Sequence, residues 1–476
     1  MKFTFRKSDF LQSIFPGLNL TDNEAVKNHL MLFYTKDGQI PKVDIDGDLV
    51  QVSLPTNPGE VYPNDFYRAT DLCMKGMYNE AIPIFENLIS KEPRISEYHR
   101  NLGQAYEELG NYPAAIDSLI EALRWNPKNN WALLLMGNIY VKTEKDFKTA
   151  LTYFDQIVES DPDNFLALSN IGGTFLQAEK PALAESFFKR AVAANPGFPN
   201  AMHGLGIIES EKGNLLEAFD LGISALKSSD LKDKRIRQVL EGFVFNVASQ
   251  YSKKEAKMDL AIDFISELEK LSGKEIQLKT DSSLPVEAKI EIAENYNRDY
   301  HLVHYRPEAP RVEHLICHEL THLKYILEAR AIDQNQLFTS GDSEFTLFQK
   351  LMDPAAKQLK SDGVTDESVK AFVNHVFHGL NSRIYNAPID LFIEDYLYYK
   401  KKELRPQQLI SLVNMDKLSL QAVTDPEIIK VTPALLLSKI KVYNAITAKQ
   451  IDQLFGTDLE SRYPLNPKEK AIVNRF

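Results

Sequence analysis

The sequence predicts a mainly α-helical protein with a small α+β part, in which a solenoid of stacked helical hairpins precedes a mixed domain. Two observations lead to this fold class. Small residues and prolines recur at intervals of 34 or 35 residues through the first half of the chain. Between about residues 272 and 307 the apolar residues alternate with period two, and from 311 to 330 they return to helical spacing.

Composition limits the classes of partner. A chain of 476 residues with 44% apolar residues has room for several cores. The net charge of −11 and the short, interrupted basic clusters predict no nucleic-acid and no membrane partner. No segment approaches the ~18 continuous apolar residues of a membrane span, the start lacks a signal-peptide core, and there are only two cysteines, so we expect a cytoplasmic protein.

The repeats are marked by three kinds of residue. Prolines, glycines and alanines keep one register, at Pro93, Pro127, Pro162 and Pro196, at Gly103, Gly137, Gly172 and Gly206, and at Ala81, Ala115, Ala150, Ala184 and Ala218. The small residues suit the close approach of two helices, aromatic residues such as Tyr106, Tyr140 and Phe175 fill the space beside them, and the proline ends the second helix. The segment SEYHRNLGQAYEELGNYPAAIDSLIEALRWNPKN shows all of these marks.

This segment resembles the tetratricopeptide repeat, and the resemblance covers about residues 60–228 with four units and a partial fifth. It implies a curved solenoid that binds a protein or peptide segment. We therefore expect a small β-containing N-terminal cap at 1–58, the repeat solenoid at 59–230, a further domain at 231–420 and a helical C-terminal extension at 421–476 that packs against that domain.

A candidate metal site lies in the helical segment 312–330. His318 and His322 are four residues apart, about 40° around a helix, so both imidazoles can bind one ion, and Glu319 lies beside them. This H-E-x-x-H spacing predicts Zn²⁺ held by His318 and His322, with Glu319 as the general base that takes a proton from a zinc-bound water.

The sequences HELTH and NAPIDLFIEDY resemble the gluzincin-type zinc metallopeptidases, over about residues 254–420. The resemblance implies a third ligand on a later helix, which Asn386 would cap and Pro388 would begin. There Asp390 and Glu394 lie four residues apart on one face. Either Asp390 is the ligand and Glu394 braces a ligand histidine, or the roles are reversed. A metzincin would need glycine and histidine where the chain has Tyr325 and Glu328.

Other residues receive weaker assignments. Tyr385 is a candidate catalytic donor to the tetrahedral intermediate, and His378 could stabilise an oxyanion. His314 lies too far along the helix to share the ion, so it is either a supporting residue or exposed. Cys317 points about 100° away from His318, which suggests a small buried residue. Residues 300–307 could form the edge strand along which an extended substrate pairs, or an ordinary core or edge strand without that role.

Together these features predict a cytoplasmic zinc-dependent peptidase that hydrolyses peptide bonds, with a repeat array that binds a protein partner or the peptide substrate. An alternative is a non-catalytic interaction scaffold whose zinc site is structural or has lapsed. A third is a protease that stays inactive until a partner docks on the repeats. The fourth position on the metal separates the first two, because a catalytic zinc keeps a water there and a structural zinc has a fourth protein ligand.

Overall fold

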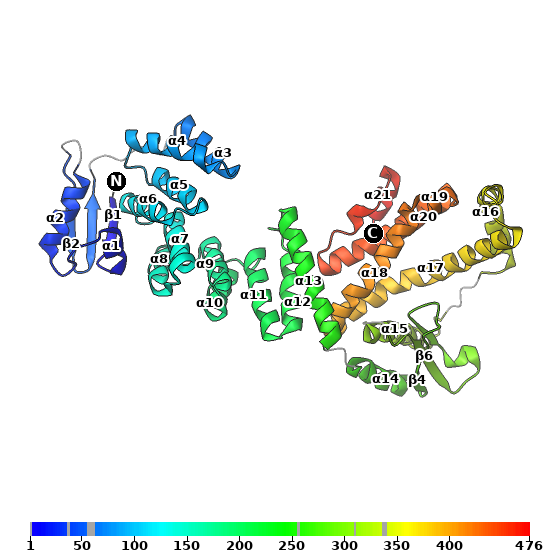
Figure 1. The fold of residues 1–476 in the computed structure, drawn as a ribbon. Coiled ribbons are helices and arrows are strands. Elements are labelled where there is room, and N and C mark those ends of the chain that lie inside the picture. Colours follow the sequence, from blue (N-terminus) through cyan, green and yellow to red (C-terminus); the bar gives the residue numbers. More distant parts are fainter. Residues whose placement is uncertain (1, 36–38, 55–61, 255–257, 309–310, 336–339) are drawn as a thin grey trace. The chain divides into compact units, whose positions relative to one another are not determined.

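The computed structural model describes residues 2–35, 39–54, 62–254, 258–308, 311–335 and 340–476. The chain divides into two compact units, residues 1–205 and 206–476, and the division falls inside helix α11 (Pro199–Lys212). Figure 1 shows that both units are mainly helical and that each contains a small sheet. Among the described residues, no helix combines the length and the apolar character that a membrane crossing requires.

The N-terminal segment is a small sheet with two helices. It consists of β1 (Lys2–Arg6), α1 (Asp9–Ile14), α2 (Asn23–Tyr34), β2 (Lys42–Asp46) and β3 (Leu49–Ser53). The strands are antiparallel in the order β1-β3-β2, and their inward side chains, including Phe5 and Val50, are buried. The boundary that we expect at residue 58 lies outside the described residues.

Four helical hairpins follow, and they are the four units that the spacing predicts. The pairs are α3 (Asn64–Met74) with α4 (Tyr78–Lys91), α5 (Ser96–Glu108) with α6 (Tyr112–Trp125), α7 (Asn130–Ile139) with α8 (Phe147–Ser160), and α9 (Phe165–Gln177) with α10 (Pro181–Ala194). The helices α11 and α12 (Leu215–Leu226) lie where the spacing predicts the partial fifth unit. Each recurring proline lies two residues beyond the end of a second helix, and the five recurring alanines are fully buried.

One unit has 35 residues because its first helix changes winding. The spacing from Gly103 to Gly137 is 34 residues, and that from Gly137 to Gly172 is 35. After α7 the chain forms a π-helical turn, η1 (Tyr140–Glu144), followed by Lys145 in the left-handed conformation at φ 51°. A π-turn takes up one extra residue, so the small residues before and after it keep their places in the array.

The N-terminal segment rests on the second helices of the repeats. The Arg124 guanidinium of α6 donates to the carbonyl of Ile14 at 2.6 Å and lies over the rings of Phe15 and Phe33, 5.1 and 5.3 Å from their centroids. Phe10 of α1 meets Tyr153 of α8 edge to face. These contacts involve α6 and α8, whereas the pocket lined by Trp131 and Leu166 lies between the first helices α7 and α9.

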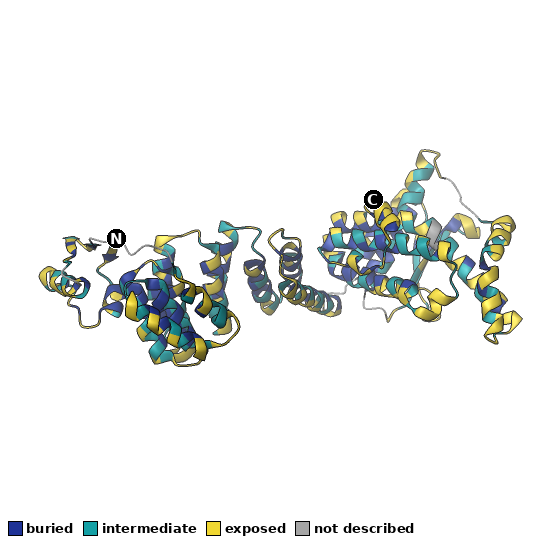
Figure 2. Ribbon diagram, turned by 90° about the horizontal axis from the view of Figure 1, so that it is seen from above, coloured by how far each residue is buried: buried dark blue, intermediate teal, exposed yellow. Residues whose placement is uncertain are grey.

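The second unit contains a three-stranded sheet among long helices. After α12 come α13 (Lys234–Lys254), α14 (Asp259–Ser272), β4 (Glu275–Thr280), β5 (Ala288–Glu291), β6 (Tyr300–Tyr305), α15 (Val312–Ala331), α16 (Asp342–Ser361), α17 (Asp366–Lys400), α18 (Arg405–Thr424), α19 (Pro426–Lys430), α20 (Ala434–Phe455) and α21 (Pro467–Val473). An apolar core joins α14, β4, β6, α15 and the second half of α17. Figure 2 shows that exposed residues dominate α16 and the first half of α17.

Two expectations about this unit are wrong. The strand β6 is central, in the order β4-β6-β5, because β4 pairs with it on one side and β5 on the other. The edge strands are therefore β4 and β5. Asn386 does not cap a helix, since α17 runs without interruption from 366 to 400 with Pro388 inside it. Pro388 removes one backbone hydrogen-bond donor from α17. The packing of Ile393 and Leu397 of the same helix in the apolar core offsets that loss.

The close helix contacts at the repeat glycines lead to a stability prediction. A Cβ added at Gly137 would lie 2.2 Å from Cε1 of Phe154, whereas a Cβ at Gly173 of α9 would meet nothing within 4 Å. We expect Gly137→Ala to lower the free energy of unfolding by about 1–3 kcal/mol through overpacking. Gly173→Ala, the control, should leave it unchanged or raise it by up to about 1 kcal/mol because alanine favours the helix. Denaturant unfolding measures both; equal effects would contradict the packing.

Candidate metal centre

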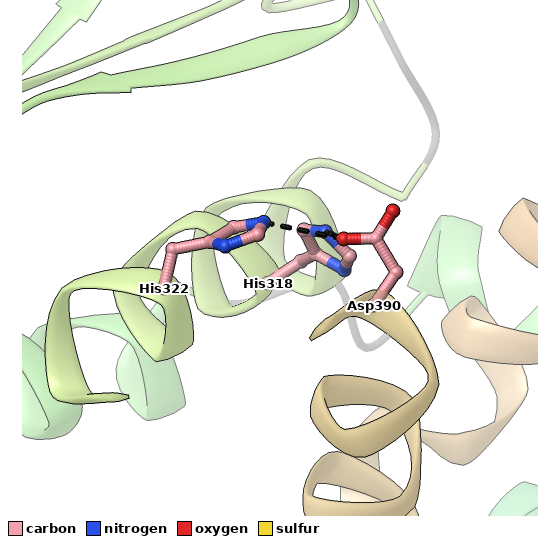
Figure 3. Close-up of side chains that lie close together, drawn as sticks. All are labelled: His318, His322 and Asp390. Atoms are coloured by element: carbon pink, nitrogen blue, oxygen red, sulfur yellow. Dashed lines mark ion pairs between the residues drawn. The ribbon is translucent and has the colours of Figure 1, made fainter. Parts of the chain in front are cut away.

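Two helices bring His318, His322 and Asp390 together (Figure 3). The histidines lie on successive turns of α15, and Asp390 extends from α17 toward them. The Nε2 atoms of His318 and His322 lie 3.5 and 3.3 Å from Oδ1 of Asp390. One ligand atom from each residue lies within 4.8 Å of the other two, which is the spacing of ligands around one ion.

The hydrogen bonds at this cluster fit a metal ion. The Nδ1 atom of His318 lies 2.8 Å from Oε1 of Glu394, so Nδ1–H donates to that carboxylate and the lone pair of Nε2 is left facing Asp390. Oδ1 of Asp390 is buried and has no hydrogen-bond partner. When Nε2 carries no proton, its lone pair and those of Oδ1 converge, and a cation would satisfy them. Two imidazoles and one carboxylate are a donor set that Zn²⁺ prefers.

The cluster is open on one side. The side chains of His318, His322 and Asp390 are 17%, 18% and 32% exposed, whereas that of Glu394 is 4% exposed. Glu394 therefore lies behind the three converging atoms rather than among them.

A buried polar network supports Glu394. Its Oε2 accepts hydrogen bonds from Nε2 of His314 at 3.1 Å and from Nε2 of Gln408 at 2.6 Å. The other ring nitrogen of His314 lies 3.0 Å from Oγ of Ser411, so His314 supports the site and is not available as a ligand. Burial alone would raise the pKa of Glu394, but His314 and His318 outweigh it and hold that pKa well below its ordinary value.

The same pairing acts on the histidine in the metal-free protein. Burial alone would lower the pKa of His318, but the carboxylates of Asp390 and Glu394 beside its two ring nitrogens, together with the charge of Glu319, raise it well above the ordinary value. A cation bound between Nε2 and Asp390 would take the place of that proton. Proton and metal thus compete for the same lone pairs.

The remaining predicted residues lie in different surroundings. Glu319 is half-buried, and its Oε2 accepts a hydrogen bond from the backbone N–H of Ile290 in β5 at 3.0 Å.

The Tyr385 hydroxyl lies 2.8 Å from Oγ of Ser340, and Tyr385 lies five residues before Asp390, about 140° around α17. Its catalytic role stays a prediction. His378 is exposed beside Phe377. Cys317 is fully buried in the apolar core, and burial raises the pKa of its thiol.

Sequence reasoning missed the contribution of α18. Gln407, Gln408 and Ser411 are buried, and they contact Glu313, His314 and Glu394 from the side opposite the exposed face. The only signal in the sequence is the pair of glutamines that precedes an apolar stretch in PQQLIS. A pair of glutamines at the start of a helix is common. Only the burial of Gln407 and Gln408 in the structure shows that they support the site.

Comparison with known proteins identifies the repeats. Family models for the tetratricopeptide repeat match residues 69–130 and 108–171, which confirms the predicted repeats over 69–171. A 150-residue segment is 30% identical to BBSome complex member BBS4 of Bos taurus, and a 155-residue segment is 26% identical to the homolog in Drosophila melanogaster. These segments are 31% and 32% of this chain and only 28% and 32% of those relatives.

Solved tetratricopeptide proteins share this likeness over part of the chain. The thermophilic repeat protein TTC0263 of Thermus thermophilus has 19% sequence identity and a TM-score of 0.33, over 38% of this chain and 97% of that one. The chain is thus a mainly helical protein that contains tetratricopeptide repeats and, in its second unit, a cluster of two histidines and an aspartate.

Proposed function

We propose that this protein is an interaction scaffold whose tetratricopeptide array binds a segment of a protein partner. The match of residues 69–171 to the repeat family carries the proposal. Two relatives that share about 150 residues with the chain are named as members of the BBSome complex, which supports the same class of function.

A pocket between two repeats suits such a segment. It has a volume of about 240 Å³ and lies between the first helices α7 and α9. Its apolar part includes Trp131 and Leu166, whose exposed fractions are 55% and 48%. Asn130 and Asn170 add amide groups that can bond to a peptide main chain. Exposed aromatic and aliphatic side chains beside amides are typical of a surface that holds an extended peptide.

The metal cluster favours a second function, the hydrolysis of peptide bonds by a zinc-dependent site in the same chain. We propose His318, His322 and Asp390 as the ligands, with Glu394 as the carboxylate that orients His318. This assignment of the two carboxylates is supported by the position of Asp390 in front of both Nε2 atoms and of Glu394 behind His318. Zinc bound there would supply an activated water and polarise a scissile carbonyl.

Glu319 is the residue that would move the proton in this reaction. It is adjacent to a ligand histidine, and one of its carboxylate oxygens is not engaged by the N–H of Ile290. As a general base it would accept a proton from water and deliver it to the leaving amine. The exposed side of the cluster supports a catalytic site over a structural one, because His314 and Glu394 on the buried side already bond to each other.

Zinc content and hydrolysis test this proposal together. We expect the full chain to hold one zinc per molecule by elemental mass spectrometry. His322→Ala should lose the metal, because two ligands hold zinc poorly. Glu319→Gln should keep the zinc and lose hydrolysis of fluorescent casein. No zinc in protein prepared without chelators would contradict the metal site; zinc without casein hydrolysis would leave the scaffold function alone.

The bracing of His318 gives a prediction about affinity. Glu394→Gln removes the charge that orients His318 and pairs with His314, so we expect zinc affinity to fall by about 10- to 100-fold. Competition with a chromophoric chelator measures it. Glu328→Gln is the control, since Glu328 is an exposed carboxylate of α15, the helix that carries His318. Equal affinity in the wild type and Glu394→Gln would show that Glu394 plays no part in metal binding.

The pocket between α7 and α9 gives a prediction about peptide binding. Peptides selected from a random library against the full chain should bind Trp131→Ala at least about tenfold more weakly, since a contacting aromatic side chain contributes strongly to such surfaces. Leu32→Ala is the control, because Leu32 is an exposed apolar residue of α2 outside the pocket. Fluorescence anisotropy measures the affinities. Selected peptides that bind both variants as they bind the wild type would place their site elsewhere.

A further inference from the structure

The edge strand β5 presents one backbone donor to the helix that carries the histidines. The strand is antiparallel to β6, and Ile290 is opposite Val303. The N–H of Arg306 donates to the carbonyl of Glu287 at 2.9 Å, which makes Glu287 and Arg306 a hydrogen-bonded pair. Bonded and non-bonded pairs alternate along an antiparallel ladder. The N–H groups of Ala288 and Ile290 therefore point away from β6, toward the free edge of the sheet.

At this edge the N–H of Ile290 meets the carboxylate of Glu319. The N···Oε2 distance is 3.0 Å, within hydrogen-bond range. The Ile290 side chain packs against the core that holds α15, so strand and helix are fixed to each other at this point. A glutamate side chain that ends in such a bond loses rotational freedom, and one oxygen, Oε1, is left for another partner.

We propose that the backbone N–H of Ile290 is a positioning group that holds the Glu319 carboxylate beside the metal cluster. Its catalytic consequence rests on the proposed peptidase function, whereas the hydrogen bond itself does not. The same bond occupies the outward donor at residue 290. An extended peptide that pairs with the edge of β5 would have to compete with Glu319 for that donor.

Amide hydrogen exchange of the full chain tests the bond without any assay of activity. In Glu319→Ala the Ile290 amide should exchange about 10- to 100-fold faster than in the wild type, as expected for loss of a bond to a charged acceptor. Glu319→Gln should keep most of the protection, because its side-chain oxygen still accepts. The amides of Ala288 and Val303 should exchange at the same rate in all three proteins. An unchanged Ile290 rate in Glu319→Ala would overturn the proposal.

A proline variant tests the effect on catalysis. Ile290→Pro removes the backbone N–H of residue 290. Because that N–H points away from β6, the substitution breaks no hydrogen bond between β5 and β6. Ile290→Ala removes most of the same side chain and keeps the N–H, and Ala288→Pro places a proline at the other outward position. We expect zinc content to be equal in all three. For fluorescent casein, kcat should fall at least about tenfold in Ile290→Pro alone, with a smaller change in KM.

The outcomes separate the two proposals. If the wild type holds zinc and does not cleave casein, the peptidase proposal fails. The exchange rate of the Ile290 amide still shows whether its hydrogen bond to Glu319 exists. If the wild type cleaves casein and Ile290→Pro and Ile290→Ala lose kcat equally, the N–H has no positioning role and the proposal is overturned.

Discussion

The buried carboxylate of Glu394 is the interaction on which the second unit depends most. It bonds to His318 and His314 of α15 and to Gln408 of α18, and it belongs to α17, so three helices meet at one charge. A carboxylate that is 4% exposed is costly unless its oxygens are fully paired. The pairing therefore requires the three helices to keep one relative position, which also places Asp390 in front of the histidines.

The repeat array depends on a different constraint, the close approach of two helices in each hairpin. Gly103, Gly137 and Gly172 lie where a Cβ would overlap Leu119, Phe154 and Phe188 of the second helices. The π-turn η1 preserves this packing across a unit that is one residue longer. Because the N-terminal segment contacts α6 and α8, the pocket between α7 and α9 remains available for a partner. The physical basis of partner binding is thus separate from that of the metal cluster.

The metal cluster and the edge strand give the second unit a set of groups with distinct tasks. Asp390 faces the converging lone pairs, Glu394 orients His318 from behind, and Glu319 is engaged by the backbone of β5. These three carboxylates differ in burial and in partners. Their different surroundings would let one act as a ligand, one as a brace and one as a base.

The sequence alone determined the repeats, the pair His318 and His322, and Asp390 and Glu394 as the two candidate carboxylates. The repeats and the histidine pair follow from spacing along one period or one helix, which is a local property, whereas the two carboxylates come from the resemblance of NAPIDLFIEDY to the gluzincin-type peptidases. Only the tertiary structure decided that Asp390 faces the histidines, that β6 is central and β5 an edge, and that Gln408 bonds to Glu394. Distances between α15, α17 and α18, or between neighbouring strands, depend on how separate elements pack, and periodicity within one element carries no information about them.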